Sequence, residues 1–201
     1  MTSSAPAPLS RTRTTAPADP ASGVLLARAA TPGEVPPGLR RRLIACWIAV
    51  TNAGGAAGFP FPPVGEAEVA PVLDRLLARL APDGHRLITA SAGGALAGWV
   101  VLGRDRDPLV AHWGTVHHLQ THPDFRGRGI GTALMRELHR VAREELGLDH
   151  LRLAARGGEG LESFYSALGW HETGRWPNAL RLRPDDTRDE VLMRYDCASV
   201  G

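Results

Sequence analysis

The stretch Leu119-Gln120-Thr121-His122-Pro123-Asp124-Phe125-Arg126-Gly127-Arg128-Gly129-Ile130-Gly131-Thr132 decides the fold of this chain. It reads as the end of a strand, a glycine-rich turn and the start of a helix. The first N–H groups of a helix have no intrahelical partner, and the helix dipole favours an anion there. Glycines let a phosphate approach the backbone, and the guanidinium groups of Arg126 and Arg128 add hydrogen-bond donors. The stretch therefore predicts a pyrophosphate-binding turn.

The spacing of the glycines separates this turn from two other phosphate-binding motifs. A P-loop requires a lysine after its last glycine, but all 23 basic residues of this chain are arginine. A dinucleotide-binding fingerprint requires Gly-x-Gly-x-x-Gly and an acidic residue at the end of the next strand. Here the spacing is Gly-x-Gly-x-Gly, and Asp149 precedes the next predicted strand. The segment instead matches Arg/Gln-x-x-Gly-x-Gly/Ala, carried by Arg126, Gly129 and Gly131.

With this pattern the chain resembles the GNAT superfamily of N-acetyltransferases. A second segment, Ser163-Phe164-Tyr165-Ser166-Ala167-Leu168-Gly169-Trp170, looks like the family's other signature, a tyrosine four residues before a glycine–aromatic pair. The resemblance covers Val24 to Cys197. A narrower likeness, in the first helix, the loop Gly54 to Phe59 and the stretch Gly169 to Leu180, is to the tabtoxin-resistance acetyltransferases. Those enzymes acetylate the amine of a small amino-acid-derived antibiotic.

Hydrophobic periodicity on both sides of the turn predicts a mixed α/β order in a single domain. The expected strands are 24–28, 86–90, 96–102, 112–121, 151–154, 170–173 and 191–195. The expected helices are 36–52, 66–80, 129–146 and 159–168. The resemblance implies a GNAT-like, mostly antiparallel sheet flanked by helices over residues 24–197.

Composition narrows the setting in which the chain works. A hydrophobic content of 43% fits a globular domain, and a net charge of +2 is too small to indicate a nucleic-acid or membrane partner. Cys46 and Cys197 lie too far apart in sequence to indicate a disulfide framework or a zinc site. Residues 1–23 are rich in Ser, Thr, Ala and Pro without an apolar core, so we expect a disordered tail and not a signal peptide. A cytoplasmic location is expected.

The resemblance also implies binding roles for acetyl-CoA, the expected co-substrate. Backbone groups of Leu119, Gln120 and Thr121 would pair with its pantetheine arm as an added strand does. The N–H of Leu119 is the candidate donor to the thioester carbonyl; the alternative is an ordinary sheet ladder. The pyrophosphate is assigned to Arg126, Gly127, Arg128, Gly129, Ile130, Gly131 and Thr132.

Two side chains are candidates for the chemistry. Tyr165 would protonate the leaving thiolate, although it also falls on an apolar helical stripe and could belong to the core. Strand alternation places His117 on one face with Leu119, and His118 on the other. His117 is therefore the candidate base, because an imidazole of pKa about 6.5 can accept a proton at neutral pH. The alternative is that His117 only shapes the pocket and the amine binds already neutral.

These expectations combine into one function and one alternative. The first is transfer of an acetyl group from acetyl-CoA to a small-molecule amine, such as an antibiotic or an amino-acid-like compound, by direct attack through a tetrahedral intermediate. The alternative is a non-catalytic acyl-CoA sensor. The histidines lack metal-site spacing, so no metal is expected. A homodimer is left open. Residues 53–63 and 176–189 are expected to line the acceptor site, and the acidic residues between 185 and 190 to form a solvated turn.

Overall fold

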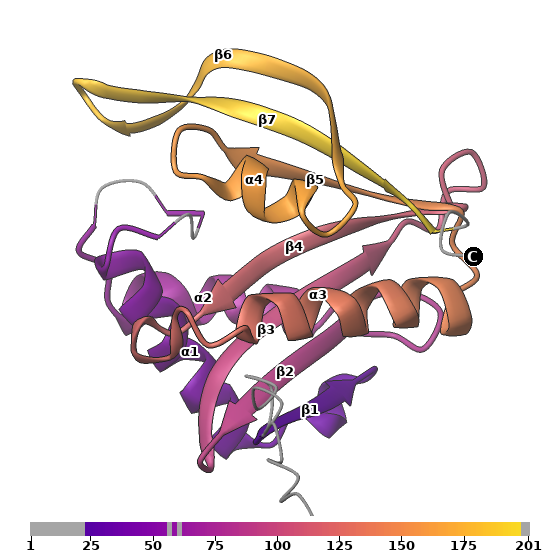
Figure 1. Cartoon of the computed structure of the whole chain (residues 1–201). Coiled ribbons are helices and arrows are strands. Elements are labelled where there is room, and N and C mark those ends of the chain that lie inside the picture. Colours follow the sequence, from indigo (N-terminus) through magenta and orange to yellow (C-terminus); the bar gives the residue numbers. More distant parts are fainter. Residues whose placement is uncertain (1–22, 56–57, 60–61, 198–201) are drawn as a thin grey trace, which may run out of the picture.

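The computed structural model describes residues 23–55, 58–59 and 62–197 (Figure 1). Within these residues, seven strands form one sheet in the order β1-β2-β3-β4-β5-β7-β6. The strands are β1 (Val24–Ala29), β2 (Arg86–Ala92), β3 (Ala95–Arg104), β4 (Trp113–Thr121), β5 (His150–Arg156), β6 (His171–Arg183) and β7 (Asp186–Asp196). The helices are α1 (Pro37–Asn52), α2 (Glu66–Leu77), α3 (Ile130–Arg140) and α4 (Leu161–Ser166). Only β4 and β5 pair in parallel, which confirms the predicted mixed, mostly antiparallel sheet.

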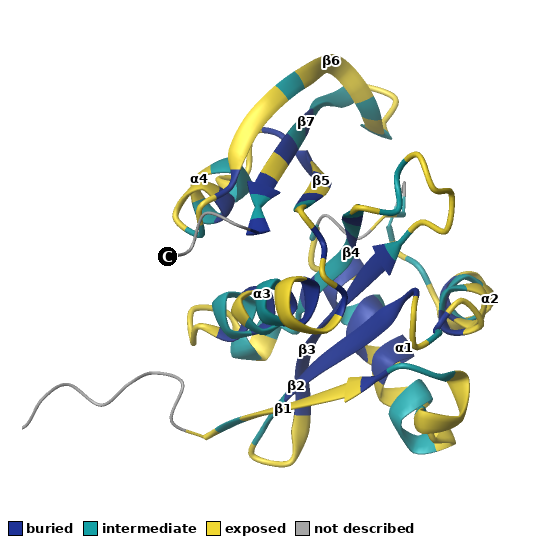
Figure 2. Ribbon diagram, turned by 90° about the vertical axis from the view of Figure 1, so that its right-hand side faces the viewer, coloured by how far each residue is buried: buried dark blue, intermediate teal, exposed yellow. Residues whose placement is uncertain are grey.

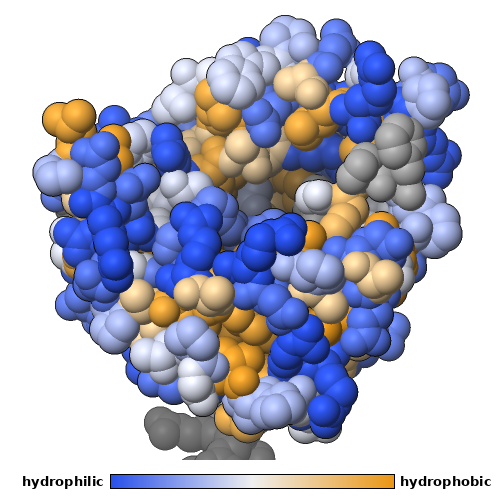
Figure 3. Space-filling model, turned by 180° about the vertical axis from the view of Figure 1, so that it is seen from behind, coloured by the Kyte–Doolittle hydropathy of each residue, from blue (hydrophilic) through white to orange (hydrophobic). Residues whose placement is uncertain are grey.

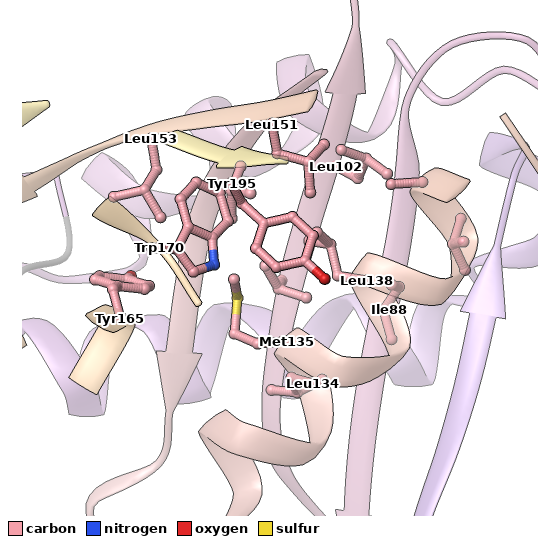
Figure 4. Close-up of a cluster of buried hydrophobic side chains, with 14 of the residues drawn as sticks. Ile88, Leu102, Leu134, Met135, Leu138, Leu151, Leu153, Tyr165, Trp170 and Tyr195 are labelled. Carbon is pink, nitrogen blue, oxygen red and sulfur yellow. The ribbon is translucent and has the colours of Figure 1, made fainter. Parts of the chain in front are cut away.

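Two hydrophobic clusters cover the two faces of the sheet. On one face, Ile88 and Val100 pack with Leu134 and Leu138 of α3, and β5, β7 and Tyr165 extend the same cluster (Figure 4). On the other face, Trp99 packs with residues of α1 and α2. Strands β2 and β3 are consequently buried between helices, whereas β6 at the sheet edge is largely exposed (Figure 2). We call these two sides of the sheet the α3 face and the α1/α2 face.

The predicted 129–146 helix is present but changes its winding near its end. After α3, residues Val141–Glu145 form a π-helical turn, in which the Leu146 N–H donates to the Val141 carbonyl at 3.1 Å. The wider turn shifts the helical phase, so Leu146 is buried and Glu145 is exposed. The apolar stripe expected from the sequence thus holds as far as Val141 and fails at Glu145, which pairs with Arg140 on the surface.

Strands β4 and β5 diverge soon after they begin. Their pairing covers only Trp113–Thr115 of β4 and His150–Arg152 of β5. Beyond Thr115, the β4 edge that faces β5 has no strand partner within the described part of the chain, and the two strands splay apart in Figure 1. The unpaired edge is open to an added strand or a ligand with amide groups.

The C-terminal strands are much longer than predicted. Residues 176–189, expected as a loop, belong largely to the hairpin of β6 and β7. Two of its acidic residues are paired: Asp186 accepts from the Arg188 Nε at 2.7 Å, and Asp189 accepts from the Asn178 N–H at 3.0 Å. Neither face of β6 is deeply buried, so its sequence lacks the alternation of apolar and polar residues that predicts a strand.

The predicted tail over residues 1–23 lies, apart from Gly23, outside the described residues. Among the helices of the described residues, none has the length and apolarity required to span a bilayer.

Candidate active site

A cleft of about 930 Å³ opens where β4 and β5 diverge. It is lined by β4 from Thr115 to Thr121, the glycine turn, the end of β5, α4 and the loop after α1. The space-filling view shows the molecule hollowed on the side away from the view of Figure 1 (Figure 3). Of the residues predicted for the site, those that line the cleft are His117, Leu119, Gln120, Thr121, Arg126, Gly127, Gly129, Ile130, Gly131, Thr132 and Tyr165.

Arg128 departs from the prediction. Its guanidinium lies over the ring of Phe125, 5.4 Å from the centroid, and Arg128 is not among the residues that line the cleft. Arg126 does line the cleft, and its Nη2 reaches toward Gly55 at the end of α1. The turn therefore offers one guanidinium to the cleft, where the sequence suggested two.

The glycine turn has the geometry of an anion site. Gly127 and Gly129 both adopt φ of +74°, a region that glycine enters without steric cost, and Gly129 is the N-cap of α3. The Ala133 N–H donates to the Gly129 carbonyl at 2.9 Å, so the N–H groups of Ile130, Gly131 and Thr132 precede the first hydrogen bond within α3. No atom lies within 4 Å of the place where a Cβ of Gly127 or Gly129 would stand. A glycine turn in open space at the start of a helix fits the pyrophosphate of acetyl-CoA.

Helix α4 places Tyr165 beside this turn. The Phe164 ring would lie 3.3 Å from a Cβ on Gly131, so the missing side chain lets α4 pack against the start of α3. Tyr165 is 8% exposed and belongs to the α3-face cluster, yet it also lines the cleft. Burial raises the pKa of its phenol to about 12. Tyr165 is therefore a core residue that also borders the cleft, with a phenol that is protonated at pH 7.

A β-bulge in β4 overturns the expected alternation of His117 and His118. In the β3–β4 pairing, His118 and Leu119 together oppose the single residue Val100, and His118 adopts a φ of +54°. After this extra residue the side chains change phase. His117 and His118 consequently both lie on the α1/α2 face, and Leu119 packs toward α3. The prediction that His117 shares its face with Leu119 and opposes His118 is wrong.

The two histidines form an uncharged lining on the α1/α2 face. The His117 ring stacks with His85 at a centroid distance of 6.1 Å, in space left by Gly103. His118 lies 4.7 Å from the ring of Trp47. Burial lowers the pKa of each imidazole to about 4, with the neighbouring His118 adding to the effect at His117. Both rings are therefore neutral at pH 7 and able to accept a proton.

Charged groups in the cleft include a pair that the sequence analysis missed. Arg156, at the end of β5, is 8% exposed; its Nη2 donates to the Gly54 carbonyl and to Glu159, both at 2.7 Å. The predicted strand stopped at Ala154, two residues short of this arginine. Its spacing of four from Arg152 was the available signal, since alternate strand residues share a face. Together with Arg126, these are the charged side chains that line the cleft among the described residues.

The loop prediction holds in part. Ala53, Gly54, Gly55 and Gly58 line the cleft, as expected for residues 53–63, whereas no residue of 176–189 does. The second expectation is wrong because that segment lies in the β6–β7 hairpin, beyond β5 in the sheet. Within the described ranges, no group of three His, Cys, Asp or Glu side chains is placed to hold a metal ion.

An open sheet with a splayed parallel pair, an anion-binding turn at the splay and a buried tyrosine across it defines an acyltransferase of the GNAT type. The family comparison agrees: residues 47–170 match the model of the acetyltransferase (GNAT) family. The chain belongs to this family.

The similar proteins support the same fold. A GNAT acetyltransferase from Streptococcus pneumoniae aligns over 86% of this chain and 99% of its own, with 18% identity and a TM-score of 0.66. The ribosomal-protein-S18-alanine N-acetyltransferase of Escherichia coli covers 88% and 97%, with 15% identity and a TM-score of 0.65. Acetyltransferase YE1169 of Yersinia enterocolitica is 37% identical over 62 residues, 31% of this chain and 40% of that protein. The match therefore spans less than half of that relative.

Proposed function

We propose that the protein transfers the acetyl group of acetyl-CoA to the amine of a small molecule. Acetyl-CoA would bind with its pyrophosphate at the glycine turn and the start of α3, residues 127 to 132. Its pantetheine amides would pair with the unpartnered edge of β4 near Leu119, Gln120 and Thr121. The observation that carries this proposal is the convergence of that edge, the turn and Tyr165 on one cleft.

The proposed reaction needs no covalent enzyme intermediate. The acceptor nitrogen attacks the thioester carbonyl, and the carbonyl oxygen gains negative charge that the Leu119 N–H would stabilise. Collapse of the tetrahedral intermediate breaks the C–S bond and expels the CoA thiolate. Tyr165 gives a proton to the sulfur, and the nitrogen loses its proton to His117, directly or through water. The raised pKa of Tyr165 keeps its phenol protonated, and the lowered pKa of His117 keeps its ring unprotonated at pH 7.

The acceptor is proposed to enter from the α1/α2 face. His117, His118 and the loop after α1 lie on that side of the sheet, opposite α3. The cleft volume of about 930 Å³ is within the range of small-ligand pockets, which supports a small-molecule acceptor. An amine bound there reaches the thioester from the side opposite the α3 core.

A thiol-release assay tests the proposal. Purified protein is incubated with acetyl-CoA and a panel of small primary amines, and free CoA is measured with a thiol reagent. Amine-dependent release with a mass-confirmed N-acetyl product is the expected result. Calorimetric binding of acetyl-CoA without release for any amine would contradict catalysis and favour the acyl-CoA sensor.

A further inference from the structure

Arg156 is an unusual residue for the wall of a cleft that takes an amine. An arginine is seldom fully buried unless its charge and its N–H groups are matched. Here the side chain is 8% exposed, and only Nη2 is used, toward the Gly54 carbonyl and Glu159. The Nε–H is buried and has no hydrogen-bond partner among the described residues. This guanidinium lines the cleft with donors to spare.

The position of Arg156 assigns it to the acceptor side. Leu151, Leu153 and Ala155 of β5 pack in the α3-face cluster, so Arg152 and Arg156 point to the opposite face by alternation. This is the face of His117 and His118. The bond to Gly54 also joins the end of β5 to the end of α1 across the cleft.

A second unpaired polar group lies on the same face. Gln120 pairs with Trp99 in the β3–β4 register, which places it on the α1/α2 face. Its side chain is 1% exposed, and neither amide atom has a hydrogen-bond partner among the described residues. Leaving such groups unpaired is costly, and a polar ligand in the cleft would satisfy them.

The charged side chains of the cleft indicate the sign of the charge that such a ligand carries. Glu159 is the one carboxylate among the described lining residues, and Arg156 neutralises it at 2.7 Å. Arg126 belongs to the turn that receives the pyrophosphate. The acceptor side therefore has spare donors and no spare anion, an environment that disfavours an acceptor whose only charge is an ammonium group.

We propose that the acceptor carries a carboxylate beside its amine, and that Arg156 is the specificity residue that binds this carboxylate. The inference rests on the proposed function and names its substrate class: a small amino acid or a compound built like one. A carboxylate accepts from a guanidinium with charge-assisted hydrogen bonds and replaces the missing partner of Arg156. The amine of the same molecule is then held on the face where His117 can take its proton.

Matched acceptors test the inference. For each of several L-amino acids, thiol release is compared with that of its primary amide and of the decarboxylated amine. The wild-type protein should show a kcat/KM about 10- to 100-fold higher for the acids, the usual size of a charge-assisted hydrogen bond. Turnover of amides or amines as efficient as that of the acids would overturn the inference and leave the proposed function standing.

Three variants separate recognition from structure. Arg156→Gln should abolish the preference for acids while the KM for acetyl-CoA stays the same; a raised KM for acetyl-CoA would place Arg156 on the cofactor instead. Arg152→Gln is the matched control, because Arg152 lies on the same strand and face, stacks on Trp113 and does not line the cleft. Glu159→Gln should lower the KM for the acids, since it removes the carboxylate that competes for Arg156. A higher KM in that variant would mean that Glu159 binds the amine and would overturn the assignment.

If no amine is acetylated, a binding measurement still tests whether Arg156 binds a carboxylate. Calorimetry then measures L-amino acids against their amides on wild-type protein saturated with CoA. Absence of thiol release would end the proposed function, while tighter binding of the acids, lost in Arg156→Gln, would still support the anion site. Equal binding of acids and amides would refute it.

Discussion

The glycine turn and the histidine bulge border the same cleft and both use positive φ, but by opposite means. Gly127 and Gly129 adopt +74° with no Cβ in the way, and their surroundings are open. His118 adopts +54° with a large side chain, at a cost of about 1–2 kcal/mol that its contacts must offset. Trp47 at 4.7 Å and Trp99 at 6.0 Å surround that ring. The turn thus offers backbone to a ligand, whereas the bulge offers side chains.

This difference determines what each region can contribute. A ligand held by backbone N–H groups is recognised by its charge and shape, which suits a co-substrate common to a whole family. A ligand held by His117 and His118 meets side chains that a relative can replace. The contrast assigns acetyl-CoA binding to the turn and acceptor chemistry to the bulged strand. Each variant below tests one of these two assignments.

The largest effect is expected where the two regions meet, at Tyr165. Tyr165→Phe should lower kcat about 100-fold, because the leaving thiolate loses its proton donor while the ring still packs. Affinity for acetyl-CoA, measured by calorimetry, should be unchanged. The matched control is Tyr195→Phe, since Tyr195 is the chain's other tyrosine, is 7% exposed and does not line the cleft. Equal kcat values for the two variants would remove Tyr165 from the chemistry.

Loss of donor binding should follow from a change in the turn. Gly129→Ala should weaken acetyl-CoA binding about tenfold, because the strained backbone no longer presents its N–H groups correctly. Gly147→Ala provides the control: Gly147 also has positive φ, +59°, and lies in open space at the far end of the α3 segment. Both variants should lose a similar amount of stability in urea unfolding. Similar affinities of the two variants for acetyl-CoA would show that the glycine turn does not bind acetyl-CoA.

A smaller, severalfold loss is expected from the bulged strand. If His117 is the base, kcat/KM rises with pH through about 4, since the ring must be deprotonated and burial holds its pKa there. His117→Ala should remove this acidic limb in a profile measured with the best acceptor, with folding checked by circular dichroism. His118→Ala shares the face and the low pKa but should keep the limb. A limb near pH 4 that persists in His117→Ala belongs to another group and removes His117 from the mechanism.

The sequence predicted those features that depend on the backbone. The strand, turn and helix around Arg126 to Thr132 have local signals in glycine and periodicity, and the structure reproduces them. The bulge at His118 has no such signal, because histidine only tolerates positive φ and alternation is the default expectation. The pairing of Arg156 with Gly54 joins residues 102 positions apart, and β6 presents two exposed faces. These features arise from tertiary contacts that a linear pattern does not contain.

Amide hydrogen exchange with and without acetyl-CoA tests whether the β4 edge and the glycine turn bind the co-substrate. We expect slower exchange on binding in peptides that cover residues 119–121 and 127–132, because the β4 edge and the N–H groups of the turn gain hydrogen bonds to the co-substrate. The turn at Gly93 and Gly94, between β2 and β3, is the internal reference and should exchange at the same rate in both samples. Unchanged exchange at residues 127–132 in protein saturated with acetyl-CoA would contradict binding of the co-substrate at the glycine turn.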